Sequence, residues 1–592
     1  MDEARDRRRA TGVLLAAVAL SAFLILYWSR GETFYADDWT YIVARQGWAL
    51  KTLFFPTVGH LIVLPLVLFK TLLEMFGADS ALPFRLAALF FVQLNGVLVY
   101  LLARRRVGPW LALVPAVLML FLGSGWEMII SPFALNALMS IAAGLGMLLF
   151  LDRSDRAGDV AAAALLVVSL ASFSLGVVFG VIAAWEVLQR PRRGLPTAWV
   201  YLVPAVLYGA WLIWASQYDQ SQLEATNIGP SPTALVDGAA AVAASIFGVF
   251  RSPGPENPAF PDLGIRIDWG IPIALALVAA LVLRLRAAPR PTPRAWALIV
   301  GLVVLWGLLA LSVGPARSLL ASRYVYPGVL LVLLLAAELV AGARISRGWR
   351  VAVLAALGVS LVANVDTIRE GGAYFRAEAS YNRAQLAALE LERDHLPDEF
   401  QVEGPSSELL PHGDMLFLAG DYFEAVDEYG SPAYSQAQLA EAGPEQRAAA
   451  DELLGRALSL SAVPVSAESI QQLRLLQPGI EPGSEADFDE DLLLRADKTS
   501  AMTARPSGTC LSLRPEQGLE GRAILPLPRG GFYYRAPDGA EVKVELGRFG
   551  DGFTVKPDPV FGSAVVQIPP DESTRPWRAL IRSSESLLAC PA

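Results

Sequence analysis

Long runs of apolar residues recur through the first 365 residues of this chain and constrain its fold more than any other feature. A run of roughly 17–25 apolar residues is long enough to cross a bilayer as a helix, and the sequence contains about eleven candidates. Hydrophobic residues make up 54% of the whole, in blocks and not with an amphipathic period, which is atypical of a soluble protein. The runs lie near residues 11–28, 82–103, 109–122, 129–151, 160–173, 175–188, 198–215, 269–285, 295–313, 325–340 and 351–364.

Clusters of arginine between these runs indicate an orientation. With the N-terminus in the cytoplasm, every cluster falls on the cytoplasmic side, as the positive-inside rule requires. An odd number of spans then places the C-terminal part outside. The first run is long and no small-residue cleavage site follows it, so we interpret it as a retained signal anchor. The clusters lie at residues 5–9, 104–106, 153–156, 190–193, 284–294 and 344–350.

Two long loops then fall on the outer side, at residues 29–81 and 217–268. The first contains another apolar run, 58–76, which holds Lys70 and Glu74 and is followed by no basic cluster. We interpret it as a helix in the outer interface. The alternative is a further span, which would invert everything after it. The second loop contains an amphipathic stretch at 233–250.

The composition changes near residue 366 to that of a soluble domain. Residues 366–506 are predicted to be mainly helical, and 507–592 to form a small β-sandwich of short alternating strands. The net charge of −9 is the sum of a net positive membrane portion and a net negative C-terminal tail. The chain has two cysteines, Cys510 and Cys590. In an oxidising compartment they form one disulfide that closes this β-rich domain; in a reducing one they are unrelated small residues.

The first functional candidates are Asp37 and Asp38, which follow the first apolar run among Phe34, Tyr35 and Trp39. Ionised groups at a membrane boundary are costly unless they line a wet cavity or perform chemistry. A partly desolvated carboxylate gains the basicity that a general base needs. The alternative is structural, because Asp38 suits the N-cap of a short helix. We favour the functional interpretation.

Four further residues are candidates for substrate binding. His60, the one histidine outside the tail, is a ligand contact or a packed core residue. Glu127 lies in a short outer turn, where it supports substrate binding or simply favours a helix dipole. Arg317 and Arg323 lie on the side where positive charge is disfavoured, which suggests an anionic partner such as phosphate; snorkelling to lipid headgroups is the alternative.

Several familiar motifs are missing from the sequence. It has no phosphate-cradling Gly-Lys-Ser/Thr loop, no dinucleotide glycine fingerprint and no His/Cys metal spacing. Nucleotide-driven pumping and nucleotide-sugar chemistry are therefore not expected, nor is a nucleic-acid partner.

The membrane portion resembles the GT-C glycosyltransferases, polytopic enzymes that take sugars from polyprenyl-phosphate carriers; their members include protein O-mannosyltransferases, aminoarabinose transferases and arabinofuranosyltransferases. The resemblance rests on the first span followed by the external Tyr35-Ala36-Asp37-Asp38-Trp39, the many-helix core, and the later external Ser322-Arg323-Tyr324-Val325-Tyr326-Pro327. The tail matches in its placement alone.

This resemblance implies a fold, a reaction and residue roles. The fold is an α-helical polytopic membrane protein with an extracytoplasmic C-terminal α+β domain. Asp37 or Asp38 acts as the base that deprotonates an acceptor hydroxyl, Arg323 binds the carrier phosphate with Arg317 as a second candidate, and Tyr324 belongs to the same motif. The reaction is direct displacement at the anomeric carbon with inversion. Some relatives use a divalent cation, but no ligand cluster here establishes a cofactor.

The expected protein is thus a glycosyltransferase of a bacterial plasma membrane. Its partners are membrane lipids, a polyprenyl-phosphate-linked sugar donor, and a glycan, lipid or protein acceptor of the cell wall or envelope. Two alternatives remain. A lipid-linked saccharide transporter or flippase would need ionisable residues near the middle of the membrane and broken helices in repeated halves, whereas these spans are nearly free of buried charge. A non-catalytic envelope scaffold would not need the acidic pair.

Overall fold

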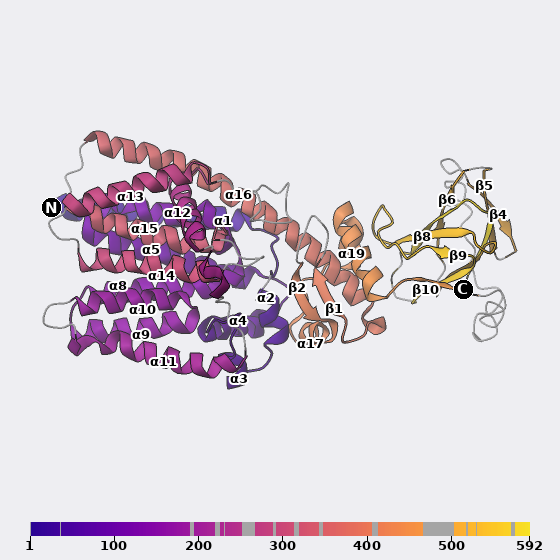
Figure 1. Cartoon of the computed structure of the whole chain (residues 1–592), viewed down its shortest axis with the longest axis horizontal. Helices are drawn as coiled ribbons and strands as arrows, with labels where there is room; N and C mark the ends of the chain where they lie inside the picture. Colours follow the sequence, from indigo (N-terminus) through magenta and orange to yellow (C-terminus); the bar gives the residue numbers. More distant parts are fainter. Residues whose placement is uncertain are drawn as a thin grey trace. The chain divides into compact units, whose positions relative to one another are not determined.

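A computed structural model of the chain divides into two compact units, Met1–Glu378 with Ser407–Pro411, and Ala379–Ser406 with His412–Ala592. Each unit is described by itself (Figure 1). The structure describes residues 2–35, 37–189, 195–218, 225–229, 231–250, 267–287, 292–312, 319–342, 347–404, 413–465, 502–508, 510–516, 519–527, 530–569, 573 and 575–591.

The first unit is a bundle of apolar helices. A helix occupies each of the eleven predicted segments. Among the described residues, seven helices are long and apolar enough to cross a membrane, or eight if one bent pair counts as a single span. The helical membrane architecture is therefore confirmed, while the count of about eleven spans is not. The helices are α1 (Asp2–Trp28), α5 (Leu82–Leu111), α6 (Leu113–Leu120), α8 (Leu135–Leu151), α9 (Arg156–Ser172), α10 (Leu175–Leu188), α11 (Trp199–Ala215), α13 (Gly270–Ala287), α14 (Pro293–Leu311), α15 (Ser322–Val340) and α16 (Arg347–Leu391).

Short elements gather at the end of the bundle opposite the start of α1 (Figure 1). The apolar run at 58–76 forms one helix, α4, which packs against α8 and α9. The amphipathic stretch of the second loop forms α12 (Ser231–Phe247), which packs against α13 and α15. The elements that follow the first span are α2 (Asp37–Trp39), the π-helix η1 (Thr40–Ala44), α3 (Leu50–Phe54) and α4 (Val63–Phe76).

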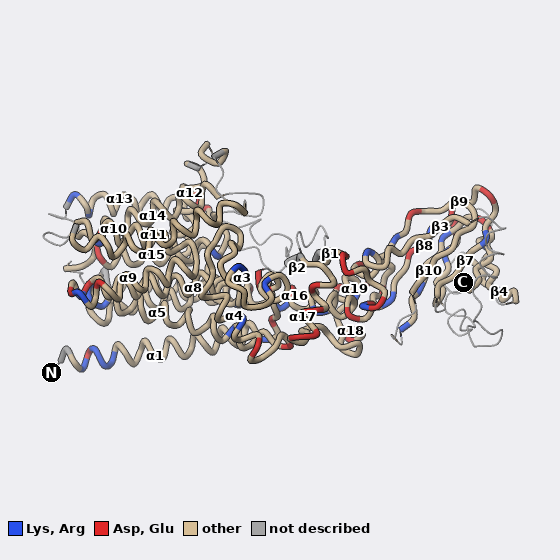
Figure 2. Tube along the Cα trace, turned by 90° about the horizontal axis from the view of Figure 1, so that it is seen from below, with Lys and Arg blue, Asp and Glu red and all other residues tan. Residues whose placement is uncertain are grey.

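At the other end of the bundle, basic and acidic residues gather along the chain (Figure 2), and two arginines from separate clusters belong to one ion network. Arg106 of α5 and Arg294 of α14 each lie 3.2 Å from a carboxylate oxygen of Asp152. Arg294 also pairs with Glu186 of α10, and Arg106 lies 2.5 Å from Glu338 of α15. These contacts bring together two of the six arginine clusters, 104–106 and 284–294, while the orientation itself stays a prediction. They also correct the expectation that the spans are nearly free of charge.

The second unit begins in the C-terminal turns of α16, which runs unbroken past residue 365. Helices α17 (Ala419–Tyr429), α18 (Gln436–Glu441) and α19 (Pro444–Ala457) follow, in the segment predicted to be helical. That segment also contains an antiparallel pair of strands, β1 (Gln401–Gly404) and β2 (Gly413–Leu418). The prediction missed these strands because such short runs carry little periodicity of their own.

The rest of this unit consists of two antiparallel sheets that share a core, as predicted for a sandwich. One has the order β3-β10-β7-β12-β5-β4 and the other β6-β11-β8-β9. The strands are β3 (Ala462–Pro464), β4 (Met502–Ser507), β5 (Cys510–Pro515), β6 (Gly521–Pro526), β7 (Gly530–Arg535), β8 (Glu541–Gly547), β9 (Val560–Phe561), β10 (Ala564–Ile568), β11 (Arg578–Ser583) and β12 (Leu587–Pro591).

Buried polar contacts tie the helices of this unit to its sheets. The carboxylate of Asp451 in α19 accepts the backbone N–H groups of Arg548, Phe549 and Gly550 at 2.8–2.9 Å. Arg548 also lies 2.9 Å from the carboxylate of Glu392, just after α16, and both side chains are almost fully buried. Breaking a pair of this kind leaves an uncompensated buried charge, so the contacts hold helices and sheets together.

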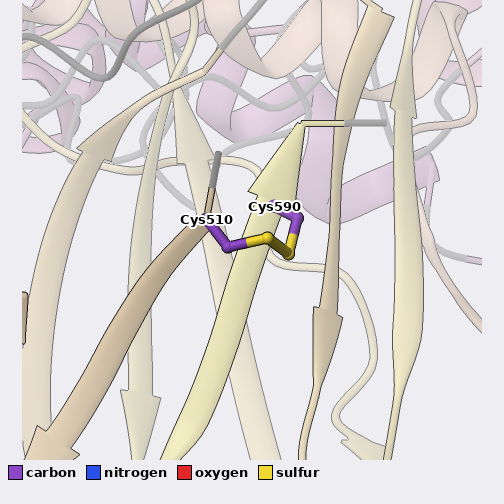
Figure 3. The surroundings of a disulfide bond; sticks show 2 residues. All are labelled: Cys510 and Cys590. Atoms are coloured by element: carbon purple, nitrogen blue, oxygen red, sulfur yellow. A yellow bond between two sulfur atoms is a disulfide. The ribbon is translucent and has the colours of Figure 1, made fainter. Parts of the chain in front are cut away.

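A disulfide joins Cys510 to Cys590 (Figure 3). The two residues lie on β5 and β12, which are neighbours in the larger sheet. The predicted bridge is therefore present, and it connects the first strands of the β-rich region to its last.

Replacing both cysteines by alanine should lower the free energy of unfolding of the second unit. The bridge spans 80 positions of sequence, and the chain-entropy relation for a loop of that length predicts a loss of about 4–5 kcal/mol. The measurement is denaturation of the full chain with and without reductant. Reduced wild type should match the variant, and an oxidised wild type no more stable than the variant would contradict the expectation.

Candidate active site

The acidic pair lies in a tight turn at the end of the loop that leaves α1. Asp38 is completely buried, whereas Asp37 is partly exposed. The Asp38 carboxylate accepts the backbone N–H of Tyr35 at 3.1 Å, and the Tyr35 carbonyl accepts the N–H of Asp38 at 3.1 Å. Asp38 thus reaches back and closes the turn from within α2, which is not the N-cap role that the sequence left open, because an N-cap accepts N–H groups that follow it.

Burial controls the protonation of Asp38. Loss of solvent raises the pKa of its carboxyl well above the ordinary value, the Tyr35 N–H opposes this shift, and the charge of Asp37 adds to it. Removing the charge of Asp37 would therefore lower the pKa of the Asp38 carboxyl.

A second buried acid, Glu32, lies near the pair and was missed from the sequence. Its carboxylate is 3.2 Å from Nε of Arg85, and Arg85 also donates to the Ser29 hydroxyl. Burial raises the pKa of Glu32, Arg85 opposes the rise, and the charge of Asp38 adds to it. The sequence feature that could have indicated Glu32 is Arg85. It is a cation in the first turn of an apolar helix, and a cation in that position needs an acidic partner.

Tyr41 on the π-helix connects the pair to the next part of the loop. It is buried, and its ring packs on Phe69 at 5.3 Å. Burial raises the pKa of its hydroxyl, with further contributions from Asp37 and Asp38, while Arg45 and a hydrogen bond with Asn136 lower it. Single π-helical turns are often found at functional sites. Neither Tyr41 nor Asn136 was predicted, because only the folded chain brings them together.

His60 is held in a strained turn. Residues Thr57 and His60 exchange both backbone hydrogen bonds, with Val58 between them at φ 50°. A β-branched residue at positive φ is a genuine outlier. Arg45 stabilises the turn by donating to the Thr57 hydroxyl at 2.7 Å, and the His60 ring packs on Phe173, after α9, at 4.2 Å. The ring is thus packed against the end of α9 while remaining partly exposed, so a role in ligand binding stays a prediction.

The structure brings Glu127, Arg323 and Tyr324 together. Glu127 of α7 (Trp126–Ile130) is almost fully buried, and its carboxylate accepts the Arg323 N–H at 3.0 Å and Nη1 of Arg323 at 2.8 Å. The guanidinium also lies 5.1 Å from the centre of the Tyr324 ring. The second arginine candidate, Arg317, lies outside the described residues.

Aromatic side chains connect this group to the acidic turn. Tyr35 packs on Phe133 at 5.9 Å and on Phe375 of α16 at 5.0 Å. Phe375 in turn packs on Trp126, the residue before Glu127, at 5.1 Å. The two groups of charged residues therefore border one apolar cluster. An acid and a cation beside a shared apolar surface suit a substrate that is part hydroxyl, part anion and part lipid.

The described residues include no cluster of three or more His, Cys, Asp and Glu side chains arranged to hold a metal ion.

Comparison with known proteins finds a similarity in structure and none in sequence. No protein-family model and no curated protein matches the chain. Among solved structures, the chain is similar to ArnT from Cupriavidus metallidurans, whose crystal structure contains bound undecaprenyl phosphate. The identity is 13% and the TM-score 0.41, over 84% of this chain and 96% of that one. At this level of similarity, neither residue roles nor activity can be transferred between the two proteins.

Replacing Asp38 by asparagine should stabilise the protein increasingly as the pH rises from about 4. The pKa of Asp38 is raised in the folded state, so below the ordinary pKa of about 3.9 the carboxyl is protonated in both states. Above it the unfolded chain loses the proton more readily, which costs folding free energy. Asparagine removes this cost.

The measurement is the melting temperature of wild type and Asp38→Asn in lipid nanodiscs between pH 4 and 8. Asp79→Asn, at an exposed acid of the same loop, is the matched control and should show no widening difference. A constant difference between wild type and Asp38→Asn at every pH would contradict the expectation.

Proposed function

We propose that the protein is an integral membrane glycosyltransferase that moves a sugar from a polyprenyl-phosphate carrier to a hydroxyl acceptor on the extracytoplasmic side. The observation that supports this most is the placement of the partly exposed Asp37 and the partly exposed Arg323 around one aromatic cluster. A base and an anion-binding cation are the two groups that such a transfer needs.

In the proposed reaction, Asp37 takes the proton of the acceptor hydroxyl. The hydroxyl oxygen forms a bond to the anomeric carbon, and the bond from that carbon to the phosphate oxygen breaks. The electron pair leaves with polyprenyl phosphate, whose charge Arg323 stabilises. A single displacement of this kind inverts the anomeric centre.

Asp37 is assigned as the base because Asp38 is fully buried and occupied with the Tyr35 N–H. A base must come within hydrogen-bond reach of the proton that it takes. Asp38 is assigned a positioning role: it holds the turn that presents Asp37. Tyr324 and His60 remain candidate contacts of the sugar or carrier.

The orientation belongs to the same proposal. The ion network of Arg106 and Arg294 would face the cytoplasm, and the acidic turn and the second unit would face outward. The disulfide between Cys510 and Cys590 suits an oxidising outer compartment. Acceptors in that compartment include glycans, lipids and proteins of the cell envelope.

The buried ion pairs at the basic end bear on the transporter alternative, which requires ionisable residues within helices. Arg106 and Arg294 are, however, paired with Asp152, Glu186 and Glu338. A network satisfied by its own members suits helix packing. It gives a transported substrate no uncompensated charge to bind.

Asp37→Asn should reduce sugar transfer by roughly 10²–10⁴-fold, the usual contribution of a general base. The assay uses membranes from cells that express each variant at equal level, with a panel of radiolabelled polyprenyl-phosphate sugars. Asp38→Asn should retain more activity than Asp37→Asn, and Asp79→Asn should resemble wild type. Equal transfer by wild type and Asp37→Asn would remove Asp37 from the mechanism.

The orientation has its own test, labelling of single introduced cysteines in intact cells with a membrane-impermeant maleimide. The two native cysteines are bridged and give no background. Ser80→Cys, at an exposed position of the outer loop, should be labelled, and Ala4→Cys, exposed at the start of α1, should not. The reverse pattern would contradict the proposed orientation.

A further inference from the structure

A break in a membrane helix brings Glu127 to its position. Helix α6 and residues Gly123–Ile130 are bent by 48° relative to each other. Non-helical backbone at such a depth is tolerated where protein surrounds it, and residues 123–132 are all buried. Because of the break, the Glu127 carboxylate lies inside the bundle, beside the first turn of α15.

Two glycines make the break possible because other helices approach its backbone closely. A Cβ at Gly123 would lie 1.9 Å from the carbonyl oxygen of Asn364 in α16, and one at Gly125 would lie 2.8 Å from the Tyr326 ring. Asn364 also accepts the Ser124 N–H at 3.3 Å. The segment that carries Glu127 is therefore fixed from two sides.

The contacts of Glu127 all lead to the start of α15. Its carboxylate oxygens accept the backbone N–H and Nη1 of Arg323, and its own N–H donates to the Ser322 hydroxyl at 3.0 Å. One buried residue thus fixes both the backbone and the guanidinium of Arg323.

The Arg323 side chain is partly exposed. Its exposed fraction is 27%, against 3% for the side chain of Glu127. Glu127 fixes Nη1 and the Tyr324 ring lies beside the guanidinium, so the group is held in one orientation with part of its surface open. A planar guanidinium held in this way is suited to a phosphate.

We infer that Glu127 is a positioning residue, which orients the Arg323 guanidinium towards the phosphate of a polyprenyl-phosphate ligand. This inference rests on the proposed function and adds to it. A bound phosphate gains from an arginine whose orientation is already set, because no side-chain freedom is lost on binding. Glu127 itself does not touch the ligand.

The competing explanation is that Glu127 only caps α15. A carboxylate near a helix N-terminus stabilises the helix whether or not a ligand exists. The two explanations differ in what they predict for ligand affinity when Arg323 has been changed.

The experiment is a double-mutant cycle on the purified full chain in nanodiscs. It measures the dissociation constant of undecaprenyl phosphate, the donor KM and the melting temperature for wild type, Glu127→Gln, Arg323→Lys and the double variant. Glutamine keeps the size of Glu127 but replaces one acceptor oxygen with a donor, so it can no longer hold both N–H groups of Arg323. Ser322→Ala is the matched control, since it removes a neighbouring contact and leaves the Glu127–Arg323 pair.

Glu127→Gln and Arg323→Lys should each weaken undecaprenyl phosphate binding and raise the donor KM by about tenfold, the size of one charge-assisted hydrogen bond. The double variant should bind no more weakly than Arg323→Lys alone, because Glu127 acts through Arg323. Ser322→Ala should leave binding unchanged.

Three results would overturn the inference. The first is an unchanged affinity for undecaprenyl phosphate in Glu127→Gln, and the second is a double variant whose loss of affinity equals the product of the two single losses. The third is tighter binding in Glu127→Gln, which would make Glu127 a competitor of the phosphate for Arg323. If Glu127→Gln does not fold, Glu127→Asp replaces it in the same cycle, with the same expectation.

The outcome separates this inference from the proposed function. A wild type that transfers sugar, with an unchanged donor KM in Glu127→Gln, refutes the inference alone. A wild type that binds undecaprenyl phosphate but transfers no sugar refutes the function, and the binding cycle still decides the inference. Neither binding nor transfer by wild type refutes both.

Discussion

The candidate site depends on carboxylates that are kept out of water at the end of a membrane bundle. Burial raises the pKa of both Asp38 and Glu32; the charge of Asp38 adds to the rise at Glu32, and Arg85 opposes it there. Carboxylates buried in this way cost folding free energy when they ionise. The aromatic cluster around Phe375 keeps this environment dry and joins it to the Glu127–Arg323 pair.

The two ends of the first unit treat charge differently. At the basic end, Arg106, Arg294 and their acidic partners form a balanced network between helices. At the other end, Asp37 and Arg323 each keep part of their surface exposed while their neighbours are fixed. The difference lies in the partners: the basic end is a network of several ion pairs, whereas the other end combines the single Glu127–Arg323 pair with a partly exposed carboxylate at Asp37.

The sequence was sufficient for features that depend on local composition, such as the apolar helices, the β-rich end and the position of the acidic pair. It was insufficient where distant residues meet. Glu127 and Arg323 were separate candidates, and only the break after α6 makes them partners. Glu32 with Arg85, and Tyr41 with Asn136, are paired by tertiary packing that no local pattern encodes. The β1–β2 pair was too short to predict.

The most direct test of the account is a cryo-electron microscopy structure of the protein in nanodiscs with undecaprenyl phosphate. The account predicts phosphate density within hydrogen-bond distance of the Arg323 guanidinium, on the side away from Glu127, with the first isoprenoid units near the aromatic cluster and Asp37 facing the phosphate. Density for the phosphate at the Arg106–Arg294 network, or at a place that contacts neither Arg323 nor the acidic turn, would contradict it.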